Sequence, residues 1–129
     1  MIVKQLSIFL ENRAGSLDEA LSILKEAHIN ISALSLADTS EFGLLRLIVD
    51  NPEKAKDAMK AAGYTSSINE LLSVDLKQEV GYLSNIIKKL SSAGINVEYM
   101  YASSSSTSGA SMIIKTDDLK KALDIVSMI

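Results

Sequence analysis

The sequence predicts an α+β protein made of two tandem copies of one strand–helix–strand–strand–helix–strand unit, with antiparallel sheets and the helices on one face. Two observations support this. "QLSIFLENRAGSL", from Gln5, aligns without gaps on "LLSVDLKQEVGYL", from Leu71, an offset of 66 residues. In both copies, hydrophobic spacing changes between the periods typical of strands and of helices in the same order.

The repeat continues beyond this segment and sets the expected domain boundaries. "LKEAHINI" matches "LSSAGINV" at the same offset, and "DNPEKAKDAMKAA" matches "DDLKKALDIVSMI" after a shift of one residue. We place the seam near 64–70 and expect units at 1–68 and 69–129. The second copy ends at the counterpart of Ala62, so it lacks a last strand. Either the stretch at 64–76 serves both sheets or the second sheet has three strands, and we favour a shared strand.

The first elements follow from local patterns. Leu6, Ile8 and Leu10 alternate with other residues, which predicts a strand with one buried face. An apolar stripe at three- and four-residue spacing over 17–27 predicts a helix. Ser16 and Glu19 have the spacing of a capping box, in which each side chain accepts a hydrogen bond from a first-turn amide.

The remaining elements of the first copy follow in order. Residues 29–36 begin a second strand, 37–43 form a turn, and the nearly continuous apolar run at 44–50 predicts a central strand. Pro52 stands where a helix begins, because that position needs no N–H. Gly63 suits the position just after the end of this helix. The complete order is the ferredoxin-like arrangement, whose uncovered sheet face favours dimers and can enclose a ligand between units.

Composition excludes several classes of function. The net charge of −3 gives no reason to bind nucleic acid or an anionic membrane, and no apolar run is long enough to span a bilayer. Without cysteine there is no thiolate metal site or thiol nucleophile, and His28 has no companion for metal binding or catalysis. We therefore expect no enzyme activity, metal or cofactor. The first residues do not resemble a signal peptide, so we expect a cytoplasmic protein.

The loop between the first strand and the first helix is the candidate site. Both copies place a polar triplet there, "ENR" and "KQE", followed by one residue and a glycine. Glycine permits a sharp turn and a close approach, and the helix N-terminus attracts a carboxylate. The amide side chain of Asn12 can hydrogen-bond an amino or a carboxylate group. From these residues alone, a plain turn with a helix cap remains the alternative.

A strand, then "ENR-x-G-x-L", then an amphipathic helix ending in "INI" resembles the ACT domains, ferredoxin-like regulatory modules that bind amino acids. The resemblance extends through both repeats and implies two tandem ACT domains. It also implies that a ligand sits where the strand–helix loop of one unit faces the second strand of another. Leu10 stands where serine-binding members have histidine, so serine specificity is not implied.

Carried over residue by residue, the resemblance implies one ligand-binding set in each copy. Asn12 and Asn30 are the central pair, with Asn30 contributed by the partner unit, and Gln78 and Asn96 are their counterparts. The complete set comprises Glu11, Asn12, Arg13, Ala14, Gly15, Ser16, Leu17, Asn30, Ile31, Gln78, Glu79, Val80, Gly81 and Asn96. Gln78 and Glu79 replace Asn and Arg, so the two sites are expected to differ.

The sequence therefore predicts a non-enzymatic regulatory protein that binds an amino acid between ACT units, forms a homodimer and acts on a partner enzyme. The alternative is an interaction module that docks on an enzyme and binds no small molecule.

Overall fold

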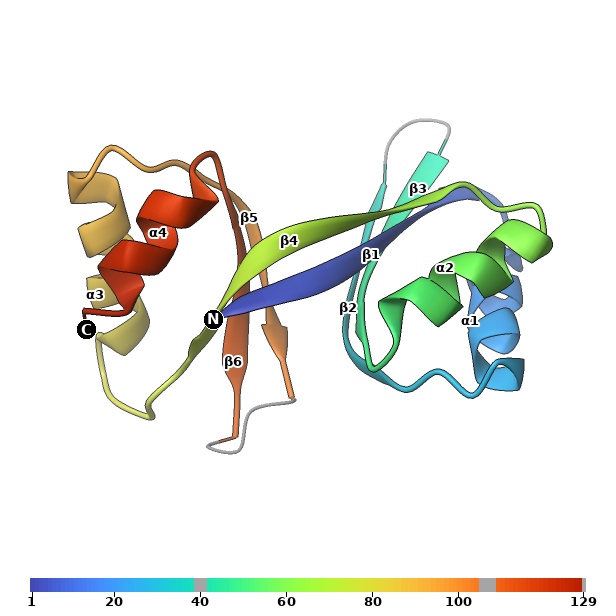
Figure 1. Cartoon of the computed structure of the whole chain (residues 1–129), viewed down its shortest axis with the longest axis horizontal. Helices are drawn as coiled ribbons and strands as arrows, with labels where there is room; N and C mark the ends of the chain where they lie inside the picture. Colours follow the sequence, from blue (N-terminus) through green and yellow to red (C-terminus); the bar gives the residue numbers. More distant parts are fainter. Residues whose placement is uncertain (39–41, 105–108, 129) are drawn as a thin grey trace. The chain divides into compact units, whose positions relative to one another are not determined.

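The computed structural model describes residues 1–38, 42–104 and 109–128. These residues form four helices and six strands, whose arrangement Figure 1 shows. Their order is β1 (Ile2–Glu11), α1 (Ser16–Glu26), β2 (Ile31–Asp38), β3 (Phe42–Val49), α2 (Pro52–Ala61), β4 (Ser66–Asp75), α3 (Tyr82–Ser92), β5 (Val97–Ser103), β6 (Ser111–Thr116) and α4 (Leu119–Val126). This is an α+β succession that repeats once, as the sequence predicts.

The strands hydrogen-bond in the order β2-β3-β1-β4-β6-β5. Contacts divide the chain into two compact units, one formed by Lys4–Asn69 and the other by Met1–Val3 together with Glu70–Ile129. The strands β1 and β4 each contribute residues to both units. The prediction of one continuous strand at the seam is therefore confirmed, because β4 runs unbroken through it.

In the unit Lys4–Asn69, which we call the first unit, helices α1 and α2 lie side by side on one face of the sheet (Figure 1). Antiparallel register places Leu6 opposite Leu47 and Ile8 opposite Leu45. These side chains are completely buried, and they pack with Leu24 of α1 and with α2. The run at 44–50 is an inner strand, since β3 lies between β2 and β1. Burial of this apolar layer is the main source of the unit's stability.

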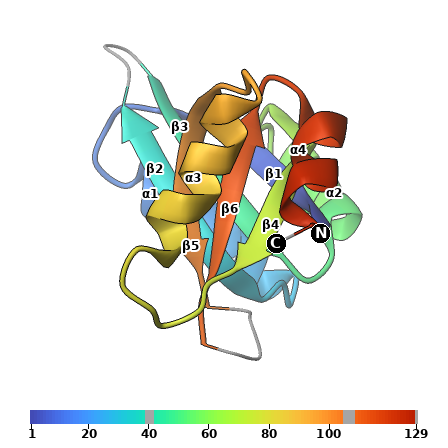
Figure 2. The ribbon, with the colours of Figure 1, turned by 90° about the vertical axis from the view of Figure 1, so that its left-hand side faces the viewer.

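The other unit, which we call the second unit, repeats this plan. Helices α3 and α4 lie side by side across one face of the strands (Figure 2). Leu72, Ile86, Leu90 and Ile114 form its buried core. No strand follows α4 within the described residues. The position beside β4 is instead held by the start of β1, where Met1 and Ser73 exchange backbone hydrogen bonds of 2.7 and 3.2 Å.

Local signals at the helix ends have mixed outcomes. Helix α2 begins at Pro52, and Gly63 follows its end with a φ of +90°, so both of these predictions are confirmed. The capping box at Ser16 and Glu19 is wrong. Gly15 occupies the N-cap position, and no side chain among the described residues caps α1. Ser16 is the first residue of the helix and so lies one position too late to cap it, and the Glu19 carboxylate is held by Arg13 and Tyr64. The predicted turn at 37–43 falls partly on residues 39–41, which lie outside the described part.

Candidate functional site

The loop between β1 and α1 ends in a glycine whose backbone conformation starts the helix. Gly15 has a φ of +93°, in the left-handed region that residues with a side chain rarely adopt. Helix α3 begins in the same way after Gly81, whose φ is +83°. By contrast, Asn51 and Asp118 cap α2 and α4 by accepting a hydrogen bond from a first-turn amide. The two helices that follow the predicted site loops are thus the two without a side-chain cap in the described structure.

Ser16 is the first residue of α1 and is buried, with 4% of its surface exposed. Its Oγ has no hydrogen-bond partner among the described residues. A buried hydroxyl without a partner is unusual, because leaving such a group unbonded costs roughly 1–3 kcal/mol. The helix start therefore combines amides that lack a side-chain cap with a hydroxyl that lacks a partner.

Arg13 organises the charged groups of this loop. Its Nε donates to Glu11 Oε2 at 3.0 Å, and its two terminal nitrogens donate to both carboxylate oxygens of Glu19, at 3.0 and 3.4 Å. Tyr64, just after α2, donates from its hydroxyl to Glu19 Oε2 at 2.9 Å. We call Glu11, Arg13, Glu19 and Tyr64 the Arg13 network. The network links the end of β1, the site loop, α1 and the segment just after α2.

The Arg13 network shifts the titration of its members in consistent directions. The hydrogen bond with Glu19 raises the pKa of Arg13, and the hydrogen bonds from Arg13 and then Tyr64 lower the pKa of Glu19. The pKa of the Tyr64 hydroxyl is raised, chiefly because the hydroxyl donates a hydrogen bond to the Glu19 carboxylate. Arg13 and Glu19 therefore stay charged near neutral pH, on a surface where salt partly screens them.

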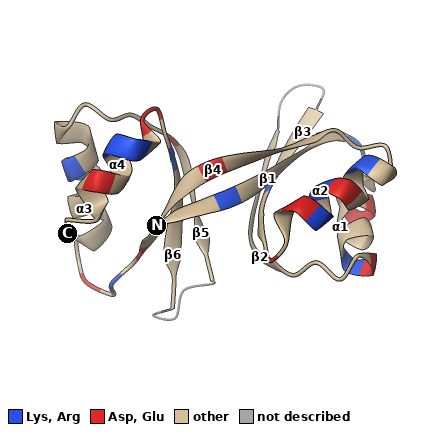
Figure 3. Ribbon diagram, viewed as in Figure 1, with Lys and Arg blue, Asp and Glu red and all other residues tan. Residues whose placement is uncertain are grey.

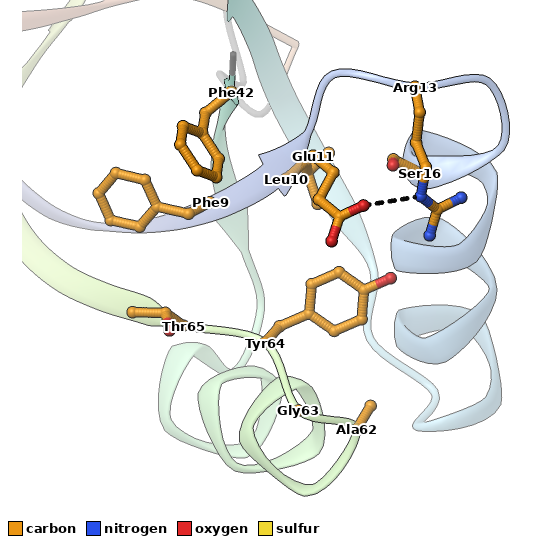
Figure 4. Close-up of a pocket in the computed structure, with 10 residues that line it drawn as sticks. All are labelled: Phe9, Leu10, Glu11, Arg13, Ser16, Phe42, Ala62, Gly63, Tyr64 and Thr65. Atoms are coloured by element: carbon orange, nitrogen blue, oxygen red, sulfur yellow. Dashed lines mark hydrogen bonds and ion pairs between the residues drawn. The ribbon is translucent and has the colours of Figure 1, made fainter.

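Two hollows flank the loop in the first unit. One, of about 330 Å³, lies between the loop and the residues after α2, and Figure 4 shows its lining. We call it the Tyr64 hollow; it is lined by Phe9, Leu10, Glu11, Arg13, Ser16, Phe42, Ala62, Gly63, Tyr64 and Thr65. The other, of about 240 Å³, lies toward β2 and is lined by Leu10, Glu11, Asn12, Arg13, Ser16, Leu17, Leu36, Ala37 and Gly43. Leu10, Glu11, Arg13 and Ser16 belong to both hollows.

The Tyr64 hollow has a polar end and an apolar end (Figure 4). The rings of Phe9 and Phe42 lie next to each other at one end, whereas Glu11, Arg13 and Ser16 lie at the other. Both phenylalanines are 50% exposed. They share one face of the sheet, because the register sets Phe9 opposite Leu44 and Glu11 opposite Phe42.

The predicted Asn12–Asn30 pair is not brought together within the unit. Asn12 lies at the start of α1, and Asn30 follows its far end. The 11 residues of the helix separate them by roughly 16 Å. The backbone of Asn30 instead exchanges hydrogen bonds with Asp50, at 3.1 and 3.2 Å, next to Ile31 at the start of β2. Asn96 makes the equivalent pair with Asp117.

The loop of the second unit differs in chemistry. A hollow of about 400 Å³ lies beside it, lined by Leu76, Lys77, Gln78, Glu79, Val80, Tyr82 and Leu83. Lys77 stands at the counterpart of Glu11 and Glu79 at that of Arg13, so the charges are reversed. Tyr82 replaces Ser16, and Lys77 lies over its ring, with Nζ 5.8 Å from the centroid. Val80, at the tip of this loop, is fully exposed.

Some lining residues escaped the sequence analysis. Phe42 falls in the segment that was assigned to a turn, and Tyr64 falls in the seam between the copies, so neither stood out. Phe9 lies between the buried Ile8 and Leu10 of the first strand, so alternation predicts that this aromatic side chain is exposed. An exposed aromatic residue is the one sequence feature that could have indicated this part of the lining. Among the described residues, no three His, Asp or Glu side chains gather to hold a metal ion, and none of the described helices is suited to crossing a membrane. Lys and Arg are interspersed with Asp and Glu in each unit (Figure 3).

Fold and loops together define a duplicated ferredoxin-like protein in which each copy has a glycine-started helix beside a hollow. The family described as "ACT domain pair" matches residues 1–128, and the chain belongs to this family. No curated protein sequence matches it.

Solved structures share the fold over nearly the whole chain. Protein BT0572 from Bacteroides thetaiotaomicron is 34% identical, with a TM-score of 0.90, covering 99% of this chain and 88% of that one. The regulatory subunit of aspartate kinase from Thermus thermophilus, in its ligand-free form, is 16% identical, with a TM-score of 0.67, covering 99% and 96%. The corresponding subunit from Thermus flavus is 15% identical, with a TM-score of 0.64, covering 99% and 94%.

Proposed function

We propose that this protein is a regulatory module that binds an amino acid beside the β1–α1 loop of the first unit. The observation that carries the proposal is Ser16, a buried hydroxyl without a partner among the described residues, at a helix start without a side-chain cap. A carboxylate in this place accepts hydrogen bonds from Ser16 Oγ and from first-turn amides, and it interacts favourably with the positive end of the helix dipole.

The charged groups around Ser16 complement both ends of an amino acid's backbone. Arg13 carries donors that recognise a carboxylate, and Glu11 accepts from an ammonium group. Their mutual ion pair is exposed, so exchanging it for contacts with a zwitterion loses little. Asn12, at the second hollow, offers a further donor and acceptor. Asn30 can join such a site only from another copy of the unit, and we retain the homodimer that this requires as part of the proposal.

The regulatory role rests on the kind of protein that shares this fold. Two of the similar solved structures are described as regulatory subunits of aspartate kinase. The ACT domain pair matches residues 1–128. We propose that the amino acid biases the docking of this chain on a partner enzyme through its differential affinity for two arrangements.

A thermal-shift screen against the twenty proteinogenic amino acids tests the proposal. A ligand that binds only the folded chain adds about 2.7 kcal/mol at a concentration one hundred times its dissociation constant. We expect one or a few amino acids to raise the melting temperature, and Arg13→Gln to reduce that rise. Lys25→Gln is the matched control, since it removes a positive charge from α1 away from both hollows. Absence of any shift for all twenty would refute amino-acid binding.

A second candidate function, docking without a small ligand, is favoured by strand β2. This edge strand carries Leu34 and Leu36, each about half exposed, and has no charged residue before Asp38. Edge strands usually carry charges that discourage pairing with other chains. If no amino acid binds but Leu34→Lys releases a partner enzyme, docking is the better account.

A further inference from the structure

The Tyr64 hollow has two chemically different ends, and the apolar end faces away from the groups that recognise an amino acid's backbone (Figure 4). Glu11, Arg13 and Ser16 supply charge and hydrogen bonding at one end, and Phe9 and Phe42 supply two rings at the other. A ligand that fills this hollow therefore needs a charged head and an apolar tail.

Covering the side chains of Phe9 and Phe42 with an apolar ligand group would contribute favourable binding free energy. Each leaves half of its surface in water in the structure. Apolar surface contributes about 25 cal/mol for each Å² removed from water, and an aromatic ring set against another adds roughly 0.5–1.5 kcal/mol. Leu10 and Thr65 also line the hollow, Leu10 with an apolar side chain and Thr65 with a hydroxyl but no charge. The lining offers no counter-ion for a charged ligand side chain beyond Glu11 and Arg13, which the backbone groups of the ligand engage.

The size of the hollow also limits the ligand. At about 330 Å³ it lies at the lower end of the range for small-molecule pockets, roughly 300–1,000 Å³. A single amino acid suits this space better than a nucleotide or a peptide.

The second unit lacks every element of this arrangement. At the repeat offset, the charged head-group residues are reversed and the two rings are missing. The counterparts of Phe9, Glu11, Arg13 and Ser16 are Asp75, Lys77, Glu79 and Tyr82, 66 residues further on. The counterpart of Phe42 is Gly109, because β6 is shifted by one more residue relative to β3. The combination of a charged end and two exposed aromatic rings is thus present at one of the two loops, both of which lie in the described residues.

We propose that the ligand is an amino acid with an aromatic or branched apolar side chain, held with that side chain against Phe9 and Phe42 and bound in the first unit alone. This rests on the proposed function, because it uses the same polar end to hold the backbone of the ligand.

Calorimetric titration of the full chain with L-phenylalanine, L-leucine, L-serine, L-lysine and L-aspartate tests the proposal. We expect L-phenylalanine or L-leucine to bind at least about tenfold more tightly than the three polar amino acids, with one ligand per chain. Phe42→Ser should weaken the apolar ligand at least about tenfold, and Phe9→Ser, on a different strand, should do the same. Ile2→Ser is the matched control, because Ile2 is also an exposed apolar residue of β1 but lines neither hollow.

The outcomes separate this proposal from the function on which it rests. If L-serine, L-lysine or L-aspartate binds most tightly and loses affinity in Arg13→Gln but not in Phe42→Ser, the amino-acid function stands and the apolar class is refuted. Binding of two ligands per chain refutes the restriction to the first unit. If none of the five binds and the remaining proteinogenic amino acids also fail, both proposals fall.

Discussion

Ser16→Ala should make the ligand-free protein more stable and the ligand weaker. The buried Oγ lacks a partner among the described residues, and burying a hydroxyl in that state costs roughly 1–3 kcal/mol. Removing a single atom at the edge of a hollow leaves little new cavity, so most of that cost is recovered. We expect the free energy of unfolding to rise by about 1–2 kcal/mol, and the dissociation constant for an amino acid to rise about tenfold, the equivalent of 1.4 kcal/mol.

Thr116→Val provides the control for this pair of effects. Thr116 is also buried, at 3% exposure, and its Oγ1 likewise has no hydrogen-bond partner among the described residues. Its counterpart in the first unit is Val49, so the substitution copies what the repeat already tolerates. We expect a similar gain in stability and no change in ligand affinity, because Thr116 lines none of the hollows described.

Urea unfolding followed by circular dichroism, with and without ligand, measures both quantities. The slope of free energy against urea must stay constant, since a changed slope indicates a changed unfolded or intermediate state. A loss of more than about 1 kcal/mol in ligand-free Ser16→Ala would show that the hydroxyl is satisfied in solution. That result would remove the main reason for placing a ligand there. Equal losses of affinity in Ser16→Ala and Thr116→Val would indicate a global effect and not a contact.

Three further predictions concern the loop, its charges and the core. Gly15→Ala and Gly81→Ala should each lower the free energy of unfolding in urea by about 1–2 kcal/mol, because both glycines have a left-handed backbone conformation. The added Cβ meets no atom within 3.4 Å in either case, so the cost is one of conformation and not of a clash. Only Gly15→Ala should also weaken ligand binding. The pKa of Glu19 is lowered, so its ionised carboxylate stabilises the folded state above the ordinary pKa of 4.5, and this effect is lost as pH falls through the shifted value. A melting series should therefore show Glu19→Gln below wild type at pH 7 and equal to it in acid. Leu24→Ala, at a completely buried position, should cost 2–5 kcal/mol in unfolding, and a cost under about 1 kcal/mol would contradict the packing.

Much of the fold could be predicted because it depends on periodicity and repetition. Alternation in β1 and the apolar stripe of α1 specify which faces are buried, and the core confirms them at Leu6, Ile8 and Leu24. Such patterns are insensitive to single residues, since every second or every third and fourth position carries the signal. The duplicated order then fixes the connection of the elements, and β4 runs through the seam as a shared strand.

The side-chain partners in the site were less accessible, because they depend on contacts distant in sequence. Glu19 has the spacing of a capping residue, yet it bonds to Arg13 and to Tyr64, which is 45 residues away. Local spacing cannot reveal a competitor such as Tyr64, which the fold brings in from the segment after α2. Gly15 is the N-cap because its backbone is left-handed, a conformation that the sequence does not specify even though a glycine recurs at this position in both copies. Phe42 was assigned to a turn, and only strand register places it beside the site loop.

The two units show which features duplication has kept and which it has changed. The core positions Leu6 and Leu24 remain leucine in the second unit, at Leu72 and Leu90, and both pairs are completely buried. Both helices after the site loops still start at a left-handed glycine without a side-chain cap in the described structure. A core and a helix start are requirements of folding, and each copy must meet them.

Charge and aromatic character at the loop are not requirements of folding, and the two copies differ in both. Arg13 and its partner carboxylates have no equivalent in the second unit, where Glu79 and Lys77 stand in reversed order. If the loop served only as a turn, either charge pattern would suffice in both units. Under the proposed function, the difference makes the units unequal: one holds the amino acid, and the other is released from that constraint and keeps a fully exposed Val80 at the tip of its loop. A calorimetric titration that finds one ligand per chain therefore tests the divergence of the repeats as well as the site.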